Sequence, residues 1–310
     1  MVKASIITIT YNRSKLLKKM IDSILTQTFR DFELIIVDNF STDDTESVVK
    51  SFADKRIRYF KNANNGILAI NLNYGMKKAE GDYIAFCDSD DLWMPEKLEK
   101  QLAYLKRHPE YGLVYSNAWI IDENENQKGV ILGKTHSQEG ELFESLLEGD
   151  FIPVLTVFMR RKVIDTVGFF NERHHIRPAE DYEFLLRASL HYKIGYIAEP
   201  LAMYREHSGM MSREINFGKI RQNVLFSIVS DPLVSNKTKL DDIAHSLYPM
   251  SAKYHWKKSD KSEAYGDLKK YLAYSIRHYR LVNILWTFYL WTLFKFDYNR
   301  LKSIKTRLFS

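Results

Sequence analysis

The chain reads Tyr83-Ile84-Ala85-Phe86-Cys87-Asp88-Ser89-Asp90-Asp91, an apolar run that becomes acidic within a few residues. The apolar half predicts a buried strand, because it holds aromatic and aliphatic side chains without proline or glycine. In the acidic half, three carboxylates within four residues repel one another. Such a cluster is costly to hold together unless a cation neutralises it, so we expect a strand that ends at a charged turn.

The acidic cluster, Asp88 to Asp91, has two interpretations when these residues are taken alone. Carboxylate oxygens suit Mg²⁺ or Mn²⁺, which commonly bind through one or two carboxylates plus phosphate oxygens. A divalent ion there would stabilise the charge that develops on a leaving diphosphate. Alternatively, Asp90 or Asp91 is the N-cap of the helix that follows Pro95, because acidic side chains favour a helix start.

Strand and helix patterns alternate on the N-terminal side of this cluster. The predicted strands are residues 4–10, 32–37 and 57–61, and the predicted helices are 13–27, 46–53 and 66–79. This alternation predicts an α/β fold, with a mostly parallel sheet flanked by helices on both faces. Ligands of such sheets gather at the carboxyl ends of the strands, so Tyr11-Asn12, Asp38-Asn39 and the acidic cluster are expected at one crevice. No Gly-x-Gly-x-x-Gly motif follows the first strand, which disfavours a dinucleotide-binding domain.

The pattern changes twice after residue 113. Residues 114–121 and 154–159 read as strands, and 181–191 read as a helix after Pro178. Beyond about residue 215, β-branched runs and glycines become scarce, and Lys, Tyr, Trp and Leu dominate. We therefore predict a catalytic domain over residues 1–215 and a mostly helical extension over 216–310.

The composition limits the classes of protein to which the chain can belong. With 310 residues, 45% hydrophobic and 27% charged, it can bury a sizeable core. A net charge of +6 over this length suggests an anionic ligand or a membrane surface and does not imply nucleic acid. Cys87 is the single cysteine, which excludes intramolecular disulfides, favours the cytoplasm and suggests a small core residue. The N-terminal residues show no signal-peptide pattern.

An apolar, aromatic segment lies near the C-terminus at residues 281–296, and basic residues flank it. It is shorter than the roughly 20 residues that a bilayer-spanning helix needs. One interpretation is a helix in the membrane interface, which would make 281–307 a peripheral membrane contact at the inner face of the cell membrane. The other is a helix that packs in a core or against a second copy of the chain in a homo-oligomer.

Several ordered motifs together resemble glycosyltransferase family 2, whose members have the GT-A fold. The resemblance covers about residues 3–212. Its motifs are, in chain order, Ser5 to Asn12, Ser23 to Thr28, Glu33 to Asp43, Asn65-Gly66 with Asn73 to Gly75, Gly81 to Asp91, Glu180 to Glu183, and Tyr204 to His207. Each motif is short, and the resemblance to the family depends on the order and spacing of all the motifs together.

The resemblance implies a nucleotide-binding group at the ends of the first two strands. Tyr11 would contact the base with Thr10 nearby, while Asp38 and Asn39 would lie at the base edge and the ribose. The family usually has two aspartates, then glycine or asparagine, then serine, where this chain has Asp38-Asn39-Phe40-Ser41. The second aspartate is therefore Asn39, and asparagine can still pair with a pyrimidine edge. We expect uridine. The same Asp38-Asn39 pair is also suited to a turn.

The resemblance also places the loop Asn65-Gly66 near the diphosphate, although an ordinary turn explains that glycine as well. The arginine that the family often has just before its Asn-x-Gly element is replaced by Leu72. The phosphate charge must therefore be met by another residue or by the metal alone.

For the metal, Mn²⁺ or Mg²⁺, the resemblance makes Asp90 the strongest ligand. Asp88 is placed toward the ribose or the metal's water shell, and Asp91 supports either. His207, in the Tyr-Arg-x-His element, would reach the metal or the diphosphate, since neutral imidazole is an acceptable ligand for Mn²⁺. A lone histidine is more often structural.

An inverting transfer also needs a base that takes the proton of the acceptor hydroxyl. Glu180-Asp181 matches the family's acidic pair, so Asp181 is the expected base and Glu180 a supporting residue. We expect the helix N-terminus to hold Asp181 ionised. Helix capping by the same carboxylates is the alternative.

The function that follows is transfer of a sugar from a nucleoside-diphosphate donor, UDP-linked, to a hydroxyl of a glycan or lipid-linked glycan. Such enzymes build cell-surface polysaccharide or glycoconjugates. A non-catalytic relative that binds nucleotide or carbohydrate would tolerate the loss of Asp90 or Asp181, and both are present. A nucleotidyltransferase would carry a glycine-rich loop after the first strand, which Tyr11-Asn12-Arg13-Ser14 is not.

Overall fold

The computed structural model describes residues 3–133, 138–173, 178–207, 217–228, 245, 248–257, 260–277, 283–285, 287–288 and 290–291. The chain divides into two compact units, Met1–Met211 and Ser212–Ser310. The domain limits inferred from the sequence, 1–215 and 216–310, stay predictions.

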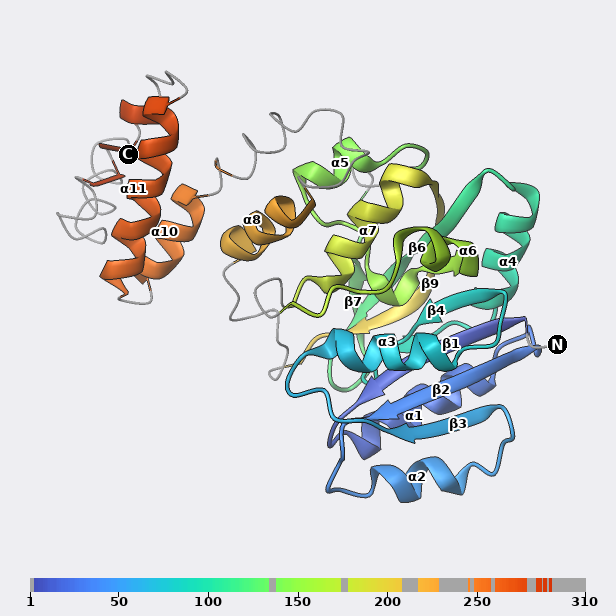
Figure 1. Ribbon diagram of the computed structural model, residues 1–310. Coiled ribbons are helices and arrows are strands. Elements are labelled where there is room, and N and C mark those ends of the chain that lie inside the picture. The colour runs from blue at the N-terminus through green and yellow to red at the C-terminus, as the bar shows by residue number, and fades with distance from the viewer. Residues whose placement is uncertain are drawn as a thin grey trace. The chain divides into compact units, whose positions relative to one another are not determined.

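A nine-stranded sheet forms the centre of the described part of the first unit. Its strands follow the order β3-β2-β1-β4-β8-β6-β9-β5, with β7 beside β6 (Figure 1). β1 to β4 run parallel to their neighbours among these four, as do β6 and β9, while β5, β7 and β8 pair antiparallel. The mostly parallel α/β fold predicted from the sequence is confirmed. The strands are β1 Ala4–Thr10, β2 Phe32–Asp38, β3 Ile57–Lys61, β4 Tyr83–Phe86, β5 Leu92–Trp93, β6 Tyr111–Ile121, β7 Gln127–Val130, β8 Phe158–Arg160 and β9 Lys193–Arg205.

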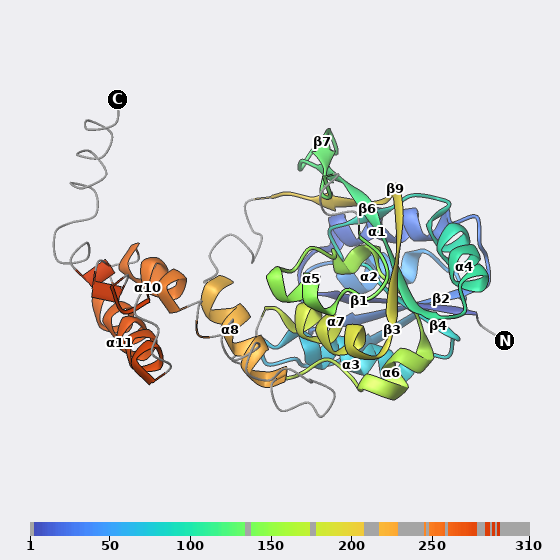
Figure 2. The ribbon, with the colours of Figure 1, turned by 90° about the horizontal axis from the view of Figure 1, so that it is seen from above.

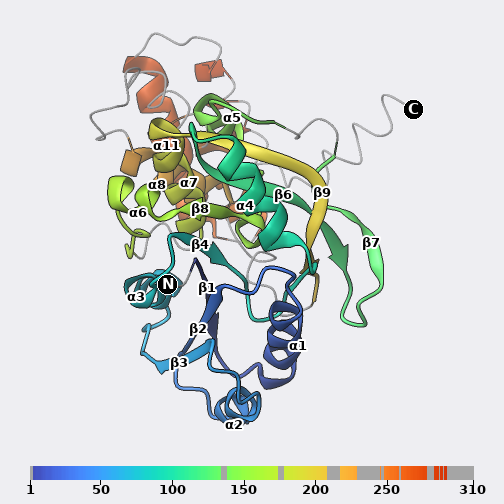
Figure 3. The same ribbon diagram turned by 90° about the vertical axis from the view of Figure 1, so that its right-hand side faces the viewer.

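Helices cover both faces of the half-sheet formed by β1, β2 and β3. Helix α3, Leu68–Lys78, packs on β1 and β2, while α1, Ser14–Leu25, and α2, Thr45–Ser51, lie on the opposite face (Figure 3). Viewed from above, the same two layers enclose the strands (Figure 2). The other helices among the described residues of the unit are α4 Lys97–Arg107, α5 Phe143–Glu148, the 3₁₀ helix η2 Val154–Thr156, α6 Arg161–Val167 and α7 Glu180–His191.

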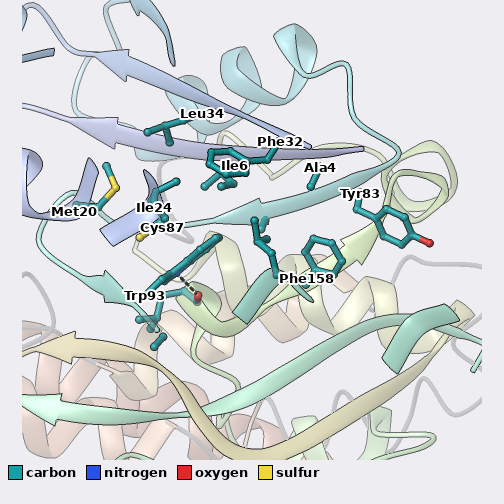
Figure 4. Close-up of a cluster of buried hydrophobic side chains, with 14 of the residues drawn as sticks. Ala4, Ile6, Met20, Ile24, Phe32, Leu34, Tyr83, Cys87, Trp93 and Phe158 are labelled. Atoms are coloured by element: carbon teal, nitrogen blue, oxygen red, sulfur yellow. Dashed lines mark hydrogen bonds between the residues drawn. The ribbon is translucent and has the colours of Figure 1, made fainter. Parts of the chain in front are cut away.

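The main core forms where α1 packs on the sheet. The buried residues of α1 follow helical spacing, so one face of the helix is apolar: Leu17, Met20, Ile21 and Ile24. They pack with Ile6 of β1, Leu34 of β2 and Phe158 of β8 (Figure 4). Cys87 is buried in the same cluster, as the sequence predicted. The acidic turn therefore begins from a rigid, fully packed strand end.

Gly81 sets the start of β4 against β1. Its N–H donates to Ser5 Oγ at 2.8 Å. A Cβ at this position would lie 2.7 Å from the carbonyl carbon of Ala4, a distance that real side chains do not reach. Only glycine allows this close approach without a backbone shift. The register of β4, and with it the position of the acidic cluster, depends on that contact.

The strand predicted over residues 154–159 is wrong in its first half. Residues Val154–Thr156 form a 3₁₀ turn, and only Phe158–Arg160 join the sheet. Side chains take the backbone acceptors that a strand would use: Trp93 Nε1 donates to Leu155 O at 3.1 Å (Figure 4), and Gln101 Nε2 donates to Thr156 O at 2.7 Å. These donors come from distant residues, so the local pattern could not reveal them.

The second unit is helical where it is described. It contains α8 Phe217–Ile228, α10 Tyr248–Lys257 and α11 Lys261–Arg277. Helix α10 packs against α11 around buried Ala252, Ala264 and Leu268. No helix among the described residues is long and apolar enough to cross a membrane. Most of segment 281–307 lies outside the described residues, so both interpretations of that segment stay predictions.

Lys97, at the first position of α4, is completely buried. Its Nζ donates to Gln101 Oε1 at 2.7 Å and lies 3.9 Å from the centroid of the Trp93 ring. Burial among these neutral partners lowers the pKa of Lys97 to about 7. The unfolded chain, with an ordinary lysine pKa near 10.4, binds more protons between these two values. Stability from this group therefore rises with pH from about 7 to about 10.

Replacing Lys97 with methionine should remove this pH dependence. The difference in unfolding free energy between Lys97→Met and the wild type should shift with pH, favouring the variant more at pH 7 than at pH 10. The shift is at most on the order of 4 kcal/mol. Urea unfolding at both pH values measures it, with the exposed Lys106→Met on the same helix as control. A difference that stays constant with pH would contradict the lowered pKa.

Candidate active site

Polar residues follow three neighbouring strands at one edge of the sheet. Strand β1 lies between β2 and β4, and all three run parallel (Figure 1). Thr10 at the end of β1 is level with Asp38 at the end of β2. The turn after β4 begins with Cys87, whose N–H bonds to Ile7 O at 3.1 Å. The turns after these strands therefore form one continuous surface.

Asp38 is fully buried and serves the turn after β2. Its Oδ1 accepts hydrogen bonds from Ser41 N at 2.9 Å and from the Ser41 hydroxyl, and its Oδ2 accepts one from Tyr59 OH. Burial and then the hydrogen bond to Asp38 raise the pKa of Tyr59 well above its usual value, so the phenol remains a donor. These hydrogen bonds are the ones expected if Asp38 stabilises a turn. A role of Asp38 at the nucleotide base or ribose stays a prediction.

Asn39 joins two turns. Its N–H donates to Thr10 O at 3.0 Å, and its Oδ1 accepts from Asn64 N at 2.9 Å. Asn64 in turn accepts from the N–H of Gly66 at 2.9 Å, and both Asn65 and Gly66 have positive φ. The loop predicted to pass the diphosphate is thus attached to the end of β2. An aspartate at position 39 could accept from Asn64 in the same way, so the substitution preserves this link.

The turn after β1 exposes an aromatic side chain beside a buried hydroxyl. Tyr11 is 52% exposed, whereas Thr10 is 4% exposed and its Oγ1 has no hydrogen-bond partner within the described structure. Asn12 fixes the turn: its N–H donates to Ser41 Oγ at 2.9 Å, and its Oδ1 accepts from Thr42 N at 2.8 Å. The turns after β1 and β2 are therefore interlocked.

Phe40 lies in the second of these turns in an unfavourable conformation. Its φ is 57°, in the left-handed region, which costs a bulky L-residue roughly 1–2 kcal/mol. Its side chain is nevertheless 54% exposed. The sequence pattern expected glycine or asparagine here, and those residues tolerate this backbone conformation more readily.

Asp90 is the most heavily bonded carboxylate of the acidic cluster. Its Oδ2 accepts from Arg13 Nη1 at 2.6 Å and contacts His207 Nε2 at 2.9 Å. The side chains of Asp90 and His207 are 14% and 15% exposed. The two residues that the sequence nominated for the metal thus meet. Helix α4 has Glu96 at its N-cap and no side-chain cap, so neither Asp90 nor Asp91 fills that role.

Arg205, at the end of β9, forms hydrogen bonds with Asp91 and with the backbone of Asp90. It is 2% exposed, its N–H donates to Asp91 Oδ1 at 2.8 Å, and its Nε donates to Asp90 O at 2.8 Å. Asp91 Oδ2 is buried without a hydrogen-bond partner among the described residues. Burial, followed by the charges of Asp88 and Asp90, raises the pKa of Asp91 well above its usual value.

Asp88 connects this cluster electrostatically to α7. Burial, followed by the carboxylates of Asp90 and Asp181, raises the pKa of Asp88 to about 7, against a lowering by Arg13. A charge influences another group strongly only at short range in a protein, so Asp181 lies near Asp88. The residues expected to serve the leaving group and the attacking group therefore share one site.

Glu180 and Asp181 occupy the first turn of α7, whose N-cap is Ala179. Asp181 Oδ1 accepts from Tyr182 N at 2.8 Å, and Glu180 is 6% exposed. The expectation that the helix N-terminus holds Asp181 ionised stays a prediction, and the backbone hydrogen bonds at this end of the helix do lower the pKa of the carboxyl. Burial raises the pKa of Asp181 and outweighs the hydrogen bonds from the backbone. A raised pKa makes the carboxylate a stronger base.

The donor set fits a divalent cation that is only partly held by protein. In the part of the chain that the structure describes, no group of three His, Cys, Asp or Glu side chains is arranged to hold a metal ion. Asp90 and His207 nevertheless converge, and Asp91 Oδ2 beside them is unpaired. Mg²⁺ commonly takes one or two carboxylates and completes its shell with phosphate oxygens and water. Two protein ligands are enough for such an ion.

Sequence reasoning missed three residues that shape the site: Arg13, Tyr59 and Arg205. The replacement of the family's arginine by Leu72 did indicate that a cation was needed elsewhere, and Arg13 stands in a turn that had already been singled out. Arg205 lies within the Tyr204 to His207 motif, although its partners are far away in sequence and no role was predicted for it. Tyr59 had no such signal, because its partner Asp38 is also distant in sequence.

Comparisons with known proteins agree with this fold. Residues 5–168 match the family model described as glycosyl transferase family 2. The chain is 32% identical to the uncharacterized glycosyltransferase MJ1057 of Methanocaldococcus jannaschii over 232 residues, 72% of this chain and 76% of that protein. It is 33% identical to the UDP-Glc:alpha-D-GlcNAc-diphosphoundecaprenol beta-1,3-glucosyltransferase WfgD of Escherichia coli over 165 residues, 53% of this chain and 63% of that protein.

Two solved structures have a similar fold. S. aureus TarS 1-349 in complex with UDP-GlcNAc has a TM-score of 0.68 at 20% identity, covering 87% of this chain and 80% of that one. The mannosyltransferase PcManGT of Pyrobaculum calidifontis, in complex with GDP-Man and Mn²⁺, has a TM-score of 0.58 at 16% identity, covering 97% and 83%. At these identities the likeness shows the fold, and the predicted GT-A architecture is confirmed.

Arg205 should be essential for stability. Replacing it with methionine removes a buried guanidinium that bonds to Asp90 O and to Glu125 Oε1, and leaving a buried acceptor without its partner costs about 1–3 kcal/mol. Urea unfolding should show that loss for Arg205→Met. The control is Lys18→Met, which breaks a pair whose lysine side chain is 57% exposed, and it should change stability by less than about 1 kcal/mol. Equal effects of the two substitutions would contradict the role given to Arg205.

Proposed function

This chain belongs to glycosyl transferase family 2, and from that membership we propose that it transfers a sugar with inversion from a nucleoside-diphosphate sugar to an acceptor hydroxyl. The observation that carries the proposal is the contact of Asp90 Oδ2 with His207 Nε2 at 2.9 Å, where the turn after β4 meets the end of β9. The carboxylate of Asp181 raises the pKa of Asp88 in the same turn, so the attacking side lies within electrostatic range of this contact. One site can therefore bind the leaving diphosphate and activate the attacking hydroxyl.

The substrate classes of this proposal draw on the relatives. TarS binds UDP-GlcNAc, and WfgD is named for UDP-Glc and an acceptor linked to diphosphoundecaprenol. They support a UDP-linked donor and a glycan or lipid-linked glycan acceptor, in the synthesis of cell-surface polysaccharide or glycoconjugates. A lipid-linked acceptor would bring the enzyme to the inner face of a membrane. Segment 281–307 would then serve as the contact with that membrane.

On the leaving side, Asp90 and His207 would hold a divalent ion, Mn²⁺ or Mg²⁺, and a neighbour in the same fold is seen with Mn²⁺. When bound, the ion would offset charge on the diphosphate. Arg13 occupies the Asp90 oxygen that such an ion would use, and its guanidinium is a second cation for the phosphates. Asp88 and Asp91 would support the ribose side and the ion's water shell.

On the attacking side, Asp181 accepts the proton of the acceptor hydroxyl. The hydroxyl oxygen forms a bond to the anomeric carbon while the bond from that carbon to the diphosphate oxygen breaks. The nucleoside diphosphate leaves with the electron pair, and the configuration inverts. The raised pKa of Asp181 supports this role because it increases the driving force for proton transfer. Glu180 is a supporting carboxylate in the same helical turn.

A donor screen that measures release of nucleoside diphosphate, with and without Mn²⁺, tests the proposal. With the donor that the wild type uses, Asp181→Asn should lower the rate of sugar transfer by roughly 10²- to 10⁴-fold while UDP affinity changes little. Asparagine keeps the hydrogen bond from Tyr182 N, so the fold should survive. The control is Asp165→Asn, the same change at an exposed position of α6. Full activity of Asp181→Asn would exclude it as the base, and release of pyrophosphate would indicate a nucleotidyltransferase.

The effect of Mn²⁺ on UDP binding distinguishes the role of Asp90 from the role of Arg13. In the wild type, Mn²⁺ should tighten UDP binding, and Asp90→Asn should abolish that enhancement. Arg13→Gln should instead tighten the binding of Mn²⁺ alone, because it removes the competitor for Asp90 Oδ2. Calorimetric titration measures both, with the exposed Asp82→Asn as control. If Mn²⁺ enhances UDP binding equally in Asp90→Asn and the wild type, Asp90 is not the ligand.

A further inference from the structure

Phe40 combines two features that neither folding nor the turn around it explains. The residue adopts φ 57°, and its aromatic side chain is 54% exposed. The hydrogen bonds that form the turn run between Asp38 and Ser41, so any side chain at position 40 would allow them. Backbone strain at a non-glycine residue tends to persist where the side chain has a function. An exposed ring held in this way is suited to a planar ligand.

Tyr11 presents a second exposed ring on the adjoining turn. The residues on either side of it are tied to the residues that flank Phe40: Thr10 O accepts from Asn39 N at 3.0 Å, and Asn12 N donates to Ser41 Oγ at 2.9 Å. The backbones of Tyr11 and Phe40 are therefore level with each other on two interlocked turns. Within the described structure, neither ring packs against another aromatic ring, and Tyr11 is 52% exposed.

We propose that Phe40 is a second aromatic contact for the nucleotide base, so that the base binds between the Tyr11 and Phe40 turns at the ends of β1 and β2. This rests on the proposed function, together with the expectation from the family resemblance that the base lies at the ends of the first two strands. Every base has a π-face, so an aromatic side chain gains affinity by stacking without reading the edge of the base. The role of Phe40 is thus affinity for the base, while the donor groups nearby set which base is bound.

Phe40→Gly is the informative variant because binding and stability should move in different directions. Glycine adopts φ 57° without strain, so the thermal midpoint should stay equal or rise. Loss of the ring should weaken UDP binding roughly tenfold in the presence of Mn²⁺. Binding of inorganic pyrophosphate, which has no base, should be unchanged. Phe40→Trp should bind UDP as well as the wild type does.

The controls separate this inference from the proposed function. Phe169→Ala removes another exposed phenylalanine, 39% exposed, that lies outside these turns, and should leave UDP binding unchanged. If the wild type binds UDP and Phe40→Gly binds it equally well, the inference about Phe40 is overturned and the proposed function stands. Equal weakening for UDP and pyrophosphate would also overturn it, since the effect would not involve the base. If the wild type binds no nucleoside diphosphate, the proposed function fails first.

Discussion

Everything at this site depends on holding three carboxylates together at the end of a buried strand. The chain supplies compensating charge itself: Arg13 bonds to the Asp90 oxygen that His207 also contacts, and Arg205 bonds to the turn through Asp91 and the Asp90 carbonyl. The penalty for burying such charges is large unless they are paired and hydrogen-bonded. This requirement brings the turn after β1, the turn after β4 and the end of β9 to one place.

That arrangement also explains why two chemical tasks can share one small region. Burial raises the pKa values of Asp88 and Asp181, and the two carboxylates influence each other. A base for the acceptor hydroxyl works best when its pKa is raised toward the working pH, whereas the leaving diphosphate needs nearby cations. In the proposed mechanism these tasks belong to different positions: Arg13 and His207 contact Asp90, and Asp181 stands on the first turn of α7.

In the turns after β1 and β2, the polar side chains mostly bond to the protein itself. The carboxylate of Asp38 accepts hydrogen bonds from Ser41 and Tyr59, and Asn39 bonds to the Asn64 loop. The side chains of these turns that are exposed to a ligand include the rings of Tyr11 and Phe40, while the unpaired hydroxyl of Thr10 is buried beside them. The departures from the family pattern, at positions 39 and 40, therefore fall in the turn that we propose contacts the nucleotide rather than in the core.

The sequence by itself determined the alternation of strands and helices, the buried strand before the acidic cluster, and the family. These follow from local periodicity and from motifs of adjacent residues, which can be recognised in the sequence without the tertiary structure. It also singled out Asp90 and His207, which meet at 2.9 Å. Only the tertiary structure decided which partners those groups take. Arg13 on Asp90, Tyr59 on Asp38 and the donors that turned residues 154–156 away from a strand all come from distant segments. The upward shift in the pKa of Asp181 was decided there too, because desolvation depends on what packs around a carboxylate and the helix position of the residue does not reveal it.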